Sequence, residues 1–118
     1  MPYFLYVGNL YEKFSGKKSI VTDKNNPYAH TFSLPVKKGD KIRATVMKKG
    51  DEHNYIVFTS CQDKFYFSDN KLIDVIDGFD KISAELEISD KICDSVKIYL
   101  WNQSGKKTYF DDFKLFYK

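Results

Sequence analysis

Apolar and polar residues alternate with a period of two through several segments of this chain, and no other feature constrains its fold as strongly. The alternation covers residues 28–34, 41–47, 82–88 and 96–101. Side chains of a β-strand point to its two faces in turn, so each segment has one apolar face and one opposite face. No segment sustains the i, i+3, i+4, i+7 apolar pattern of an amphipathic helix. The alternation therefore predicts an all-β chain.

Polar segments that contain a glycine lie between the alternating segments, as in KKGDK at 37–41 and QSGKK at 103–107. Glycine supplies the positive φ that tight turns need. We expect strands at 3–8, 18–22, 28–34, 40–48, 55–60, 64–68, 81–88, 96–102 and 108–117, with a short strand or one helical turn at 71–78. Many short strands separated by turns are typical of a sandwich or a barrel. The sequence contains no linker or repeat, so we expect a single domain over residues 1–118.

The phase of the alternation predicts which side chains face the core. In the segment 96–101, Val96, Ile98 and Leu100 form the apolar face. Tyr99 and Trp101 should then project from the opposite face, with Lys97 beside them. In the segment 28–34, one face is formed by Tyr28, His30, Phe32 and Leu34. We expect that face to be the buried one.

The last two expected strands flank the polar tetrad Ser104–Lys107, which contains Gly105. Two alternating segments around a short glycine-containing turn are typical of a β-hairpin. We therefore expect residues 96–117 to form an antiparallel hairpin, with its turn at this tetrad.

Charge and motifs argue against several function classes. The net charge is only +3 and Arg43 is the only arginine, whereas surfaces that bind nucleic acid rely on arginine, so no nucleic-acid partner is expected. No run of 18 apolar residues occurs, so no membrane insertion is expected. The first residues, MPYFLYVGNLYEK, do not show the pattern of a signal peptide. GxSxG, HExxH, P-loop and GxGxxG motifs are absent, so we expect no enzymatic activity.

The two cysteines, Cys61 and Cys93, lie 32 residues apart and form no CxxC motif. Two cysteines do not make a disulfide framework, and we favour the interpretation that both are small, buried apolar residues. The alternative is a single disulfide, which an exported domain would permit. The two histidines, His30 and His53, lack the spacing of metal ligands.

The C-terminal segment SVKIYLWNQSGKKTYFDDFKLFYK at 95–118 resembles the closing strands of galactose-binding-like jelly-roll domains, the fold of many carbohydrate-binding modules. The matching residues are Val96, Ile98, Tyr99, Trp101, Asn102, Tyr109, Phe110, Asp111, Asp112, Phe113 and Leu115. The segment PYAHTFSLPVKKGDKIRATVMKKG at 27–50 resembles two earlier strands of the same family through Tyr28, Phe32, Leu34, Gly39, Asp40, Lys41 and Ile42. The resemblance implies an antiparallel jelly-roll β-sandwich.

Members of this family often hold a structural Ca²⁺ with an early acidic residue and an aspartate of the final strand. Glu12, in YEKFSG at 11–16, and Asp111 or Asp112 are the residues to which the resemblance assigns this role. Calcium prefers six to eight oxygen ligands, which carboxylates and carbonyls supply. The alternative is that one aspartate is buried and hydrogen-bonded while the other is solvated.

The resemblance also implies a function, that of a non-catalytic carbohydrate-binding module or accessory domain of an exported glycan-processing protein, secreted or at the cell surface. Such a domain binds a polysaccharide or oligosaccharide and is part of a larger protein or a monomer. Sugar rings present apolar C–H faces that stack on flat aromatic side chains. The candidate ligand-binding residues are Tyr99, Trp101 and Tyr66 for stacking, and Arg43 and Gln103 for hydrogen bonds.

Two alternatives stay open. Trp101 is a structural residue in the first of them, because the tryptophan of this strand often packs internally in the family. In the second, the chain is a structural or protein-interaction β-sandwich of a surface protein and has no sugar site. An exposed aromatic patch on a sheet would favour sugar binding, whereas lysine-covered sheets with a buried Trp101 would favour the second alternative.

Overall fold

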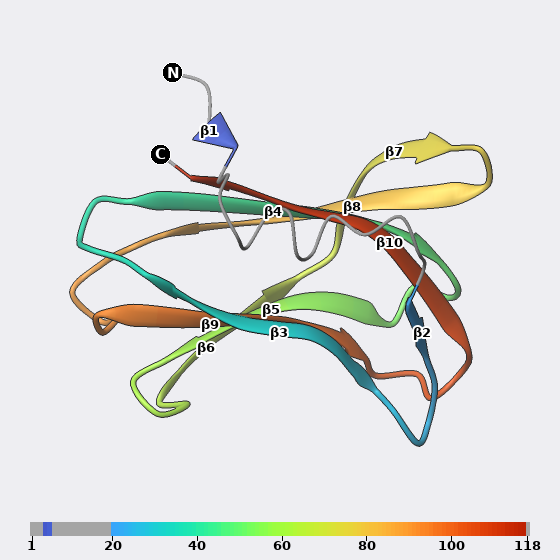
Figure 1. Ribbon diagram of the computed structural model, residues 1–118, viewed down its shortest axis with the longest axis horizontal. Helices are drawn as coiled ribbons and strands as arrows, with labels where there is room; N and C mark the ends of the chain where they lie inside the picture. Colours follow the sequence, from blue (N-terminus) through green and yellow to red (C-terminus); the bar gives the residue numbers. More distant parts are fainter. Residues whose placement is uncertain (1–3, 6–19, 118) are drawn as a thin grey trace.

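The computed structural model of the protein describes residues 4–5 and 20–117, which form an all-β sandwich of two antiparallel sheets (Figure 1). The strands are β1 (Phe4–Leu5), β2 (Ile20–Thr22), β3 (Tyr28–Pro35), β4 (Lys41–Lys49), β5 (Asn54–Ser60), β6 (Phe65–Asp69), β7 (Lys71–Ile76), β8 (Phe79–Glu87), β9 (Ser95–Asn102) and β10 (Thr108–Tyr117). The described residues contain no helix that would be able to cross a membrane. The predicted fold class is confirmed.

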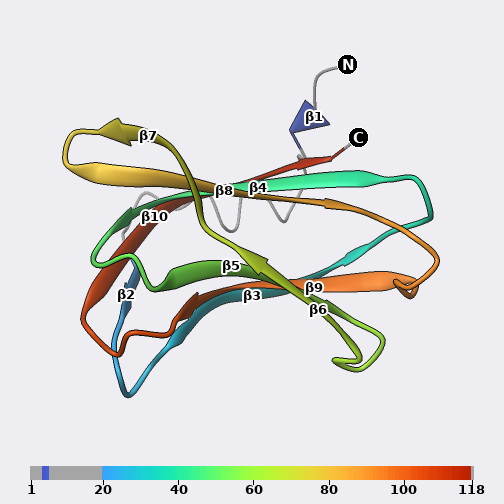
Figure 2. The same ribbon diagram turned by 180° about the vertical axis from the view of Figure 1, so that it is seen from behind.

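The strand order follows a jelly-roll path. One sheet has the order β1-β10-β4-β8-β7, with β2 also paired to β10, and the other has the order β3-β9-β5-β6. The chain passes from one sheet to the other between β2 and β3, β3 and β4, β4 and β5, β6 and β7, β8 and β9, and β9 and β10. The two layers lie face to face in both views (Figures 1 and 2).

The ambiguous segment 71–78 forms strand β7 and a tight turn rather than a helical turn. The turn residues Asp77 and Gly78 both have positive φ, of 52° and 83°. Two such residues make the turn that matches the twist of a two-stranded hairpin, and Asp-Gly is a preferred sequence for it. Ile76 and Phe79 are the closing pair of the resulting β7–β8 hairpin.

The predicted hairpin at 96–117 is wrong, because β9 and β10 belong to different sheets. β9 lies between β3 and β5, and β10 pairs with β4 and β2. Both strands carry apolar side chains that fill the same core, and they reach it from opposite layers. The Asn102 side chain organises the crossing: its Nδ2 donates to the Lys106 carbonyl at 2.6 Å, and its Oδ1 accepts from the Ser104 hydroxyl at 2.8 Å.

The core lies between the two sheets and is filled from both. Val96, Ile98 and Leu100 of β9 are completely buried, as predicted. They meet the buried apolar residues of the other sheet, which include Ile42, Ala44, Val46, Ile82, Phe110 and Phe113. The alternation therefore places the apolar half of β9 in the core and turns Tyr99 and Trp101 outward, where both are half-buried.

The predicted core face of the segment 28–34 is wrong at Tyr28. Tyr28 is 57% exposed, whereas its neighbour Ala29 is buried. The register between β3 and β9 shifts between Ala29 and Phe32. A β-bulge of this kind inserts an extra residue and reverses which side chains face the core. Tyr28 therefore lies on the outer face, while Leu34, beyond the bulge, lies in the core.

Cys61 and Cys93 form a disulfide, with their Cα atoms 5.3 Å apart. Cys61 is half-buried and Cys93 is exposed, so the favoured interpretation of two buried thiols is wrong and the alternative is correct. The bond joins the turn after β5 to the loop before β9. These two strands are neighbours in the four-stranded sheet, which brings the two loops together at one end of it.

Candidate functional site

The outer face of the four-stranded sheet carries a cluster of aromatic side chains. We call it the aromatic face, and it consists of Tyr28 on β3, Tyr55 on β5, Tyr66 on β6, and Tyr99 and Trp101 on β9. Trp101 is the register partner of Tyr28 on one side and of Tyr55 on the other. Cross-strand partners on one face bring their Cβ atoms to about 5 Å, which is close enough for rings to contact. The pairing of the strands therefore assembles the cluster.

Trp101 lies between two tyrosine rings. Its ring stacks on that of Tyr28, with centroids 6.5 Å apart and planes 17° apart. On the other side the ring of Tyr55 lies 5.9 Å away, tilted by 39°. Trp101 is thus the middle ring of a row of three, Tyr28, Trp101 and Tyr55, and it packs against both of the others. The most exposed rings of the aromatic face are Tyr28 and Tyr66, at 57% and 52%.

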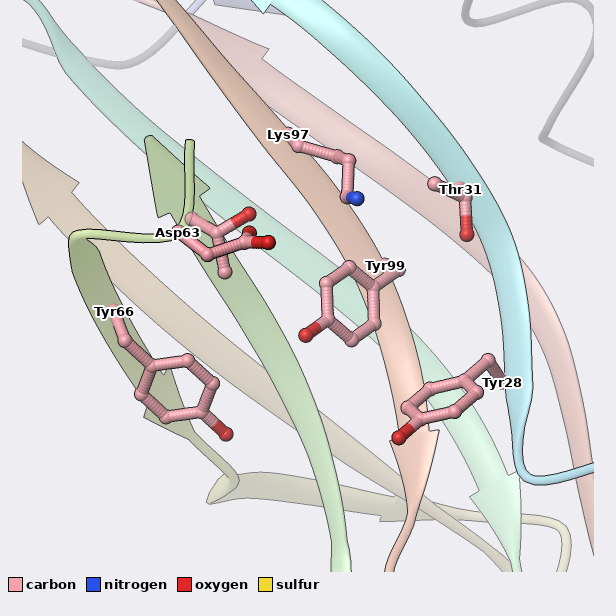
Figure 3. Close-up of a pocket in the computed structure, with 7 residues that line it drawn as sticks. Tyr28, Thr31, Asp63, Tyr66, Lys97 and Tyr99 are labelled. Carbon is pink, nitrogen blue, oxygen red and sulfur yellow. The ribbon is translucent and has the colours of Figure 1, made fainter. Parts of the chain in front are cut away.

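The aromatic face encloses a hollow of ≈ 430 Å³ (Figure 3). It is lined by Tyr28, Thr31, Thr59, Asp63, Tyr66, Lys97 and Tyr99. Tyr99 lies between the other two tyrosines, and the hydroxyls of Tyr28 and Tyr66 point inward from opposite sides (Figure 3). Aromatic walls with a few polar groups are the usual lining of a site for a small organic ligand.

A buried valine lies beside Tyr99 in the register of the same sheet. Val57 is the register partner of Tyr99 and has the outward phase of Tyr55 and Thr59, yet it is completely buried. It is not a member of the core cluster between the sheets. Tyr99, its register partner, meets Tyr28 edge to face at 5.6 Å. The outer side of this sheet thus has a buried apolar residue next to Tyr99 in register.

The electrostatics of the hollow centre on Tyr99. Burial raises the pKa of the Tyr99 phenol above its ordinary value, and the nearby Tyr66, Tyr28 and Asp63 raise it further. The phenol consequently stays neutral at physiological pH, so it both donates and accepts hydrogen bonds. Lys97 Nζ lies 5.9 Å from the centre of the Tyr99 ring. With Asp63, it gives the hollow one charged group of each sign.

The turn that carries Asp63 has an unusual backbone. Cys61, Gln62 and Asp63 all have positive φ, of 57°, 56° and 66°. Each residue other than glycine costs about 1–2 kcal/mol in this left-handed conformation. Such strain persists only where the surroundings enforce it, and it clusters at functional sites. Here the disulfide to Cys93 holds the turn beside the hollow.

A hydrogen-bonded serine reinforces the same turn. The Ser60 hydroxyl donates to the Ser95 carbonyl at 2.6 Å and accepts from the Cys93 N–H at 3.1 Å. The Lys64 N–H donates to the Cys61 carbonyl at 3.2 Å, which closes the turn. These bonds fix the start of β6 and thereby the position of Tyr66.

The structure brings together some of the predicted ligand-binding residues and separates others. Tyr99 and Tyr66 line the hollow, and Trp101 does not line it but stacks on Tyr28, which does. Arg43 is on β4 of the other sheet, where its guanidinium lies over the ring of Phe116 at 4.8 Å from the centroid. Gln103 follows β9 and donates its backbone N–H to the His53 carbonyl at 3.0 Å. Arg43 and Gln103 therefore do not belong to the lining of the hollow.

Four lining residues were missed from the sequence, namely Tyr28, Thr31, Thr59 and Asp63. The bulge in β3 reverses the phase of Tyr28, and a bulge leaves no reliable mark in the alternation. Asp63 reaches the hollow through three left-handed residues that are not glycine, so turn composition gives no signal for it. An enrichment of tyrosine over several strands was the only usable indication.

Of the residues predicted to bind calcium, the structure describes Asp111 and Asp112. Asp111 and Asp112 lie at a bulge in β10, where Asp112 has a φ of 53°. The Asp111 carboxylate accepts the Asp112 N–H at 2.8 Å, and the Asp112 carboxylate pairs with Lys114 Nζ at 3.3 Å. Glu12 lies outside the described residues. Within residues 4–5 and 20–117 no group of three or more His, Cys, Asp or Glu is placed to hold a metal, so these two aspartates do not make a calcium site by themselves.

Comparisons with known proteins leave the family of the chain unassigned. No protein-family model matches the chain. No curated protein matches it. Among solved structures it is similar to the N-terminal CBM22-1–GH10 modules of endo-1,4-beta-D-xylanase 10B from Clostridium thermocellum, solved with xylohexaose, at 13% identity and a TM-score of 0.47. The match covers 87% of this chain and 25% of that chain, so this chain spans about a quarter of the length of the solved modules.

Proposed function

We propose that this chain is a non-catalytic carbohydrate-binding domain and that the aromatic face is its binding site. The observation that carries the proposal is the pair of exposed rings, Tyr28 and Tyr66, on either side of a hollow whose centre is Tyr99. Exposed tyrosine rings offer flat apolar surfaces to the C–H faces of sugars, and their hydroxyls bind sugar hydroxyls. Both rings are more than half exposed, so both are open to a ligand.

Each lining residue has a role in this proposal. Tyr28 and Tyr66 stack against sugar rings, and the neutral Tyr99 phenol exchanges hydrogen bonds with a sugar hydroxyl. Asp63 accepts hydrogen bonds from hydroxyls and Lys97 donates them, so the two orient a neutral ligand rather than select one charge. No covalent bond is made or broken in this binding.

The setting of the domain is part of the proposal. We infer that it is an accessory domain of a secreted or surface-attached glycan-processing protein. The Cys61–Cys93 disulfide supports this inference, because disulfides persist in oxidising, extracellular compartments and are rare in the cytosol. The alternative function, a protein-interaction sandwich, is favoured by one observation: strand β7 exposes four apolar side chains.

Binding titrations on matched tyrosine variants test the proposal. Calorimetry against a panel of oligosaccharides and sedimentation with insoluble polysaccharides should show binding by the wild type. Tyr66→Ala and Tyr28→Ala should each lower the affinity by about tenfold or more, as removal of a central aromatic contact does. Tyr109→Ala is the control, because Tyr109 is a half-buried tyrosine on β10 of the other sheet. Loss of affinity in the control alone, or a wild type that binds no glycan, would contradict the proposal.

A further inference from the structure

Strand β7 forms an apolar edge of the six-stranded sheet. Among the described strands it ends the sheet order and pairs with β8 alone. All six of its side chains are exposed, including Leu72, Ile73, Val75 and Ile76, which are 40–59% exposed. A free edge presents unpaired backbone N–H and C=O groups, and natural proteins usually protect such an edge with charge or cover. The four exposed apolar side chains of β7 are a surface suited to another strand, provided that the strand also complements its charged residues.

The two charged residues of β7 identify which strand fits. Lys71 and Asp74 are three positions apart, with Leu72 and Ile73 between them. If a second copy of β7 pairs antiparallel so that Lys71 lies opposite Asp74 of that copy, then Asp74 lies opposite its Lys71. Leu72 then lies opposite Ile73 in the same way. Because a twofold axis relates the copies, the ion pair forms twice from one strand sequence.

A β-bulge makes this pairing stereochemically consistent. In a regular strand, residues three positions apart point to opposite faces. They cannot then lie directly opposite each other in an antiparallel pair of identical strands. Lys71 is the register partner of Ser83 on β8, and Asp74 is the partner of Lys81, two residues away. The register shift between Leu72 and Asp74 therefore turns Lys71 and Asp74 to the same face. Directly opposite residues of an antiparallel pair must share a face, and these two do.

The position of β7 leaves room for a second copy. The β7–β8 hairpin extends from one end of the six-stranded sheet, on the side of the sandwich away from β3, β9 and β6 (Figures 1 and 2). The Asp74 carboxylate accepts the Val75 N–H at 2.8 Å, which holds this side chain close to the strand. Because β7 belongs to the sheet opposite the aromatic face, a partner on β7 would leave that face uncovered.

We propose that two copies of this chain associate through β7, as an antiparallel pair with Lys71 opposite Asp74 in both directions. The two six-stranded sheets then continue into one another across the twofold axis. The apolar side chains of β7, which are exposed in the single chain, then lie beside those of the second copy and are partly covered by them. This association does not depend on sugar binding.

A charge-swap series tests the proposal by analytical ultracentrifugation over a wide range of concentration. The wild type should form a dimer reversibly. Lys71→Asp and Asp74→Lys each place like charges opposite one another at both ends of the pair, so each should weaken the dimer by about tenfold or more. The double variant K71D/D74K should form the homodimer again. An equimolar mixture of the two single variants should form a heterodimer, since every pair is then of opposite charge.

Lys106→Asp is the matched control, because it changes the charge of an exposed lysine in the loop between β9 and β10. It should leave the dimer unchanged, and circular dichroism should show that all variants are folded. A wild type that stays monomeric at every concentration overturns the proposal. A dimer that survives both single substitutions, or a double variant and mixture that fail to associate, overturns the Lys71–Asp74 register. Neither result bears on glycan binding, which the tyrosine variants test separately.

Discussion

The outer faces of the two sheets differ in chemistry although their strands share the same alternation. On the four-stranded sheet the outward cross-strand partners are Tyr28, Trp101 and Tyr55 in one row. Between β4 and β8 of the six-stranded sheet the corresponding partners are Lys41–Glu87, Arg43–Glu85 and Thr45–Ser83. The second face carries charged partners, with Lys41 Nζ 4.0 Å from Glu87 Oε1, and the buried hydroxyls of Thr45 and Ser83, but no row of aromatic rings between these two strands. The first combines exposed rings with a hollow, and this difference locates the proposed site on one side of the molecule.

The comparison also separates what holds the fold from what forms the site. The inner halves of both sheets make one shared core, whereas the aromatic face has its own buried residue, Val57, and its own covalent link, Cys61–Cys93. Substitutions in the core should therefore affect the whole molecule. Substitutions on the aromatic face should affect binding more than folding. The predictions below test this division, beginning with the largest expected change in stability.

Leu100→Ala should have the largest effect. Leu100 is completely buried in the shared core, so its truncation should lower the free energy of unfolding by about 2–5 kcal/mol. Urea denaturation measures this change. A loss below about 0.5 kcal/mol would mean that the side chain is not in a packed core, and that the inward phase of β9 is wrong.

Removal of the disulfide should have the next largest effect, and it should lower both the stability and the affinity for glycan. The double variant Cys61→Ser/Cys93→Ser should lose about 2–4 kcal/mol of stability, as is typical when a native disulfide is removed. It should also bind glycan more weakly at temperatures where it is still folded, because the strained turn at Asp63 is no longer held. A reducing agent should reproduce both effects in the wild type and change nothing in the double variant. Full affinity in the folded double variant would show that the turn does not organise the site.

Trp101→Ala should have an intermediate effect on stability. The ring is half-buried between Tyr28 and Tyr55, so its loss should cost about 1–2 kcal/mol, less than truncation of a fully buried aromatic residue. Glycan affinity should fall as well, because Tyr28 loses its stacking partner. Trp101→Phe keeps a ring at this position and should retain most of the stability and most of the glycan affinity. A cost of about 3–5 kcal/mol with unchanged affinity would instead assign Trp101 to the core alone.

The sequence predicted the parts of the molecule in which alternation is regular. β9 alternates without interruption, so the inward phase of Leu100 and the outward phase of Tyr99 followed directly. The bulge in β3 breaks the alternation, so the exposure of Tyr28 did not follow. Gly105 has the positive φ that was expected of it and lies between two strands, yet a glycine of this kind does not say whether the next strand pairs with the last or joins the opposite sheet. Long-range partners of this kind depend on packing, which local patterns do not encode.

The same reasoning applies to the site. Tyr66 and Tyr99 were identified because each is out of phase with apolar neighbours on its own strand. Arg43 was selected by residue type alone, and the topology places it on the other sheet. The disulfide brings together two loops separated by 32 residues, and with only two cysteines the sequence did not decide between a bond and two free thiols.

Chelation of calcium should have the smallest effect and concerns the sheet opposite the aromatic face. If Glu12 completes a site with Asp111 or Asp112, EDTA should lower the melting temperature and excess calcium should restore it. A ligand that binds only the folded state stabilises that state by mass action. Asp111→Asn should remove the response to calcium. A melting temperature that is the same in EDTA and in excess calcium would exclude the site that the resemblance implies.

The most direct test uses Trp101 as a probe, because it is the only tryptophan of the chain and it lies within the aromatic face. A glycan that stacks on Tyr28 contacts the residue packed against this indole, so its binding should change the tryptophan emission. Titration of the wild type with a glycan that binds in calorimetry should give a saturable change in emission, with the same dissociation constant by both methods. In Tyr28→Ala and Tyr66→Ala the curve should shift to higher concentrations. Saturable binding in calorimetry that leaves the emission unchanged and is unaffected by either substitution would place the sugar elsewhere and contradict the proposed site.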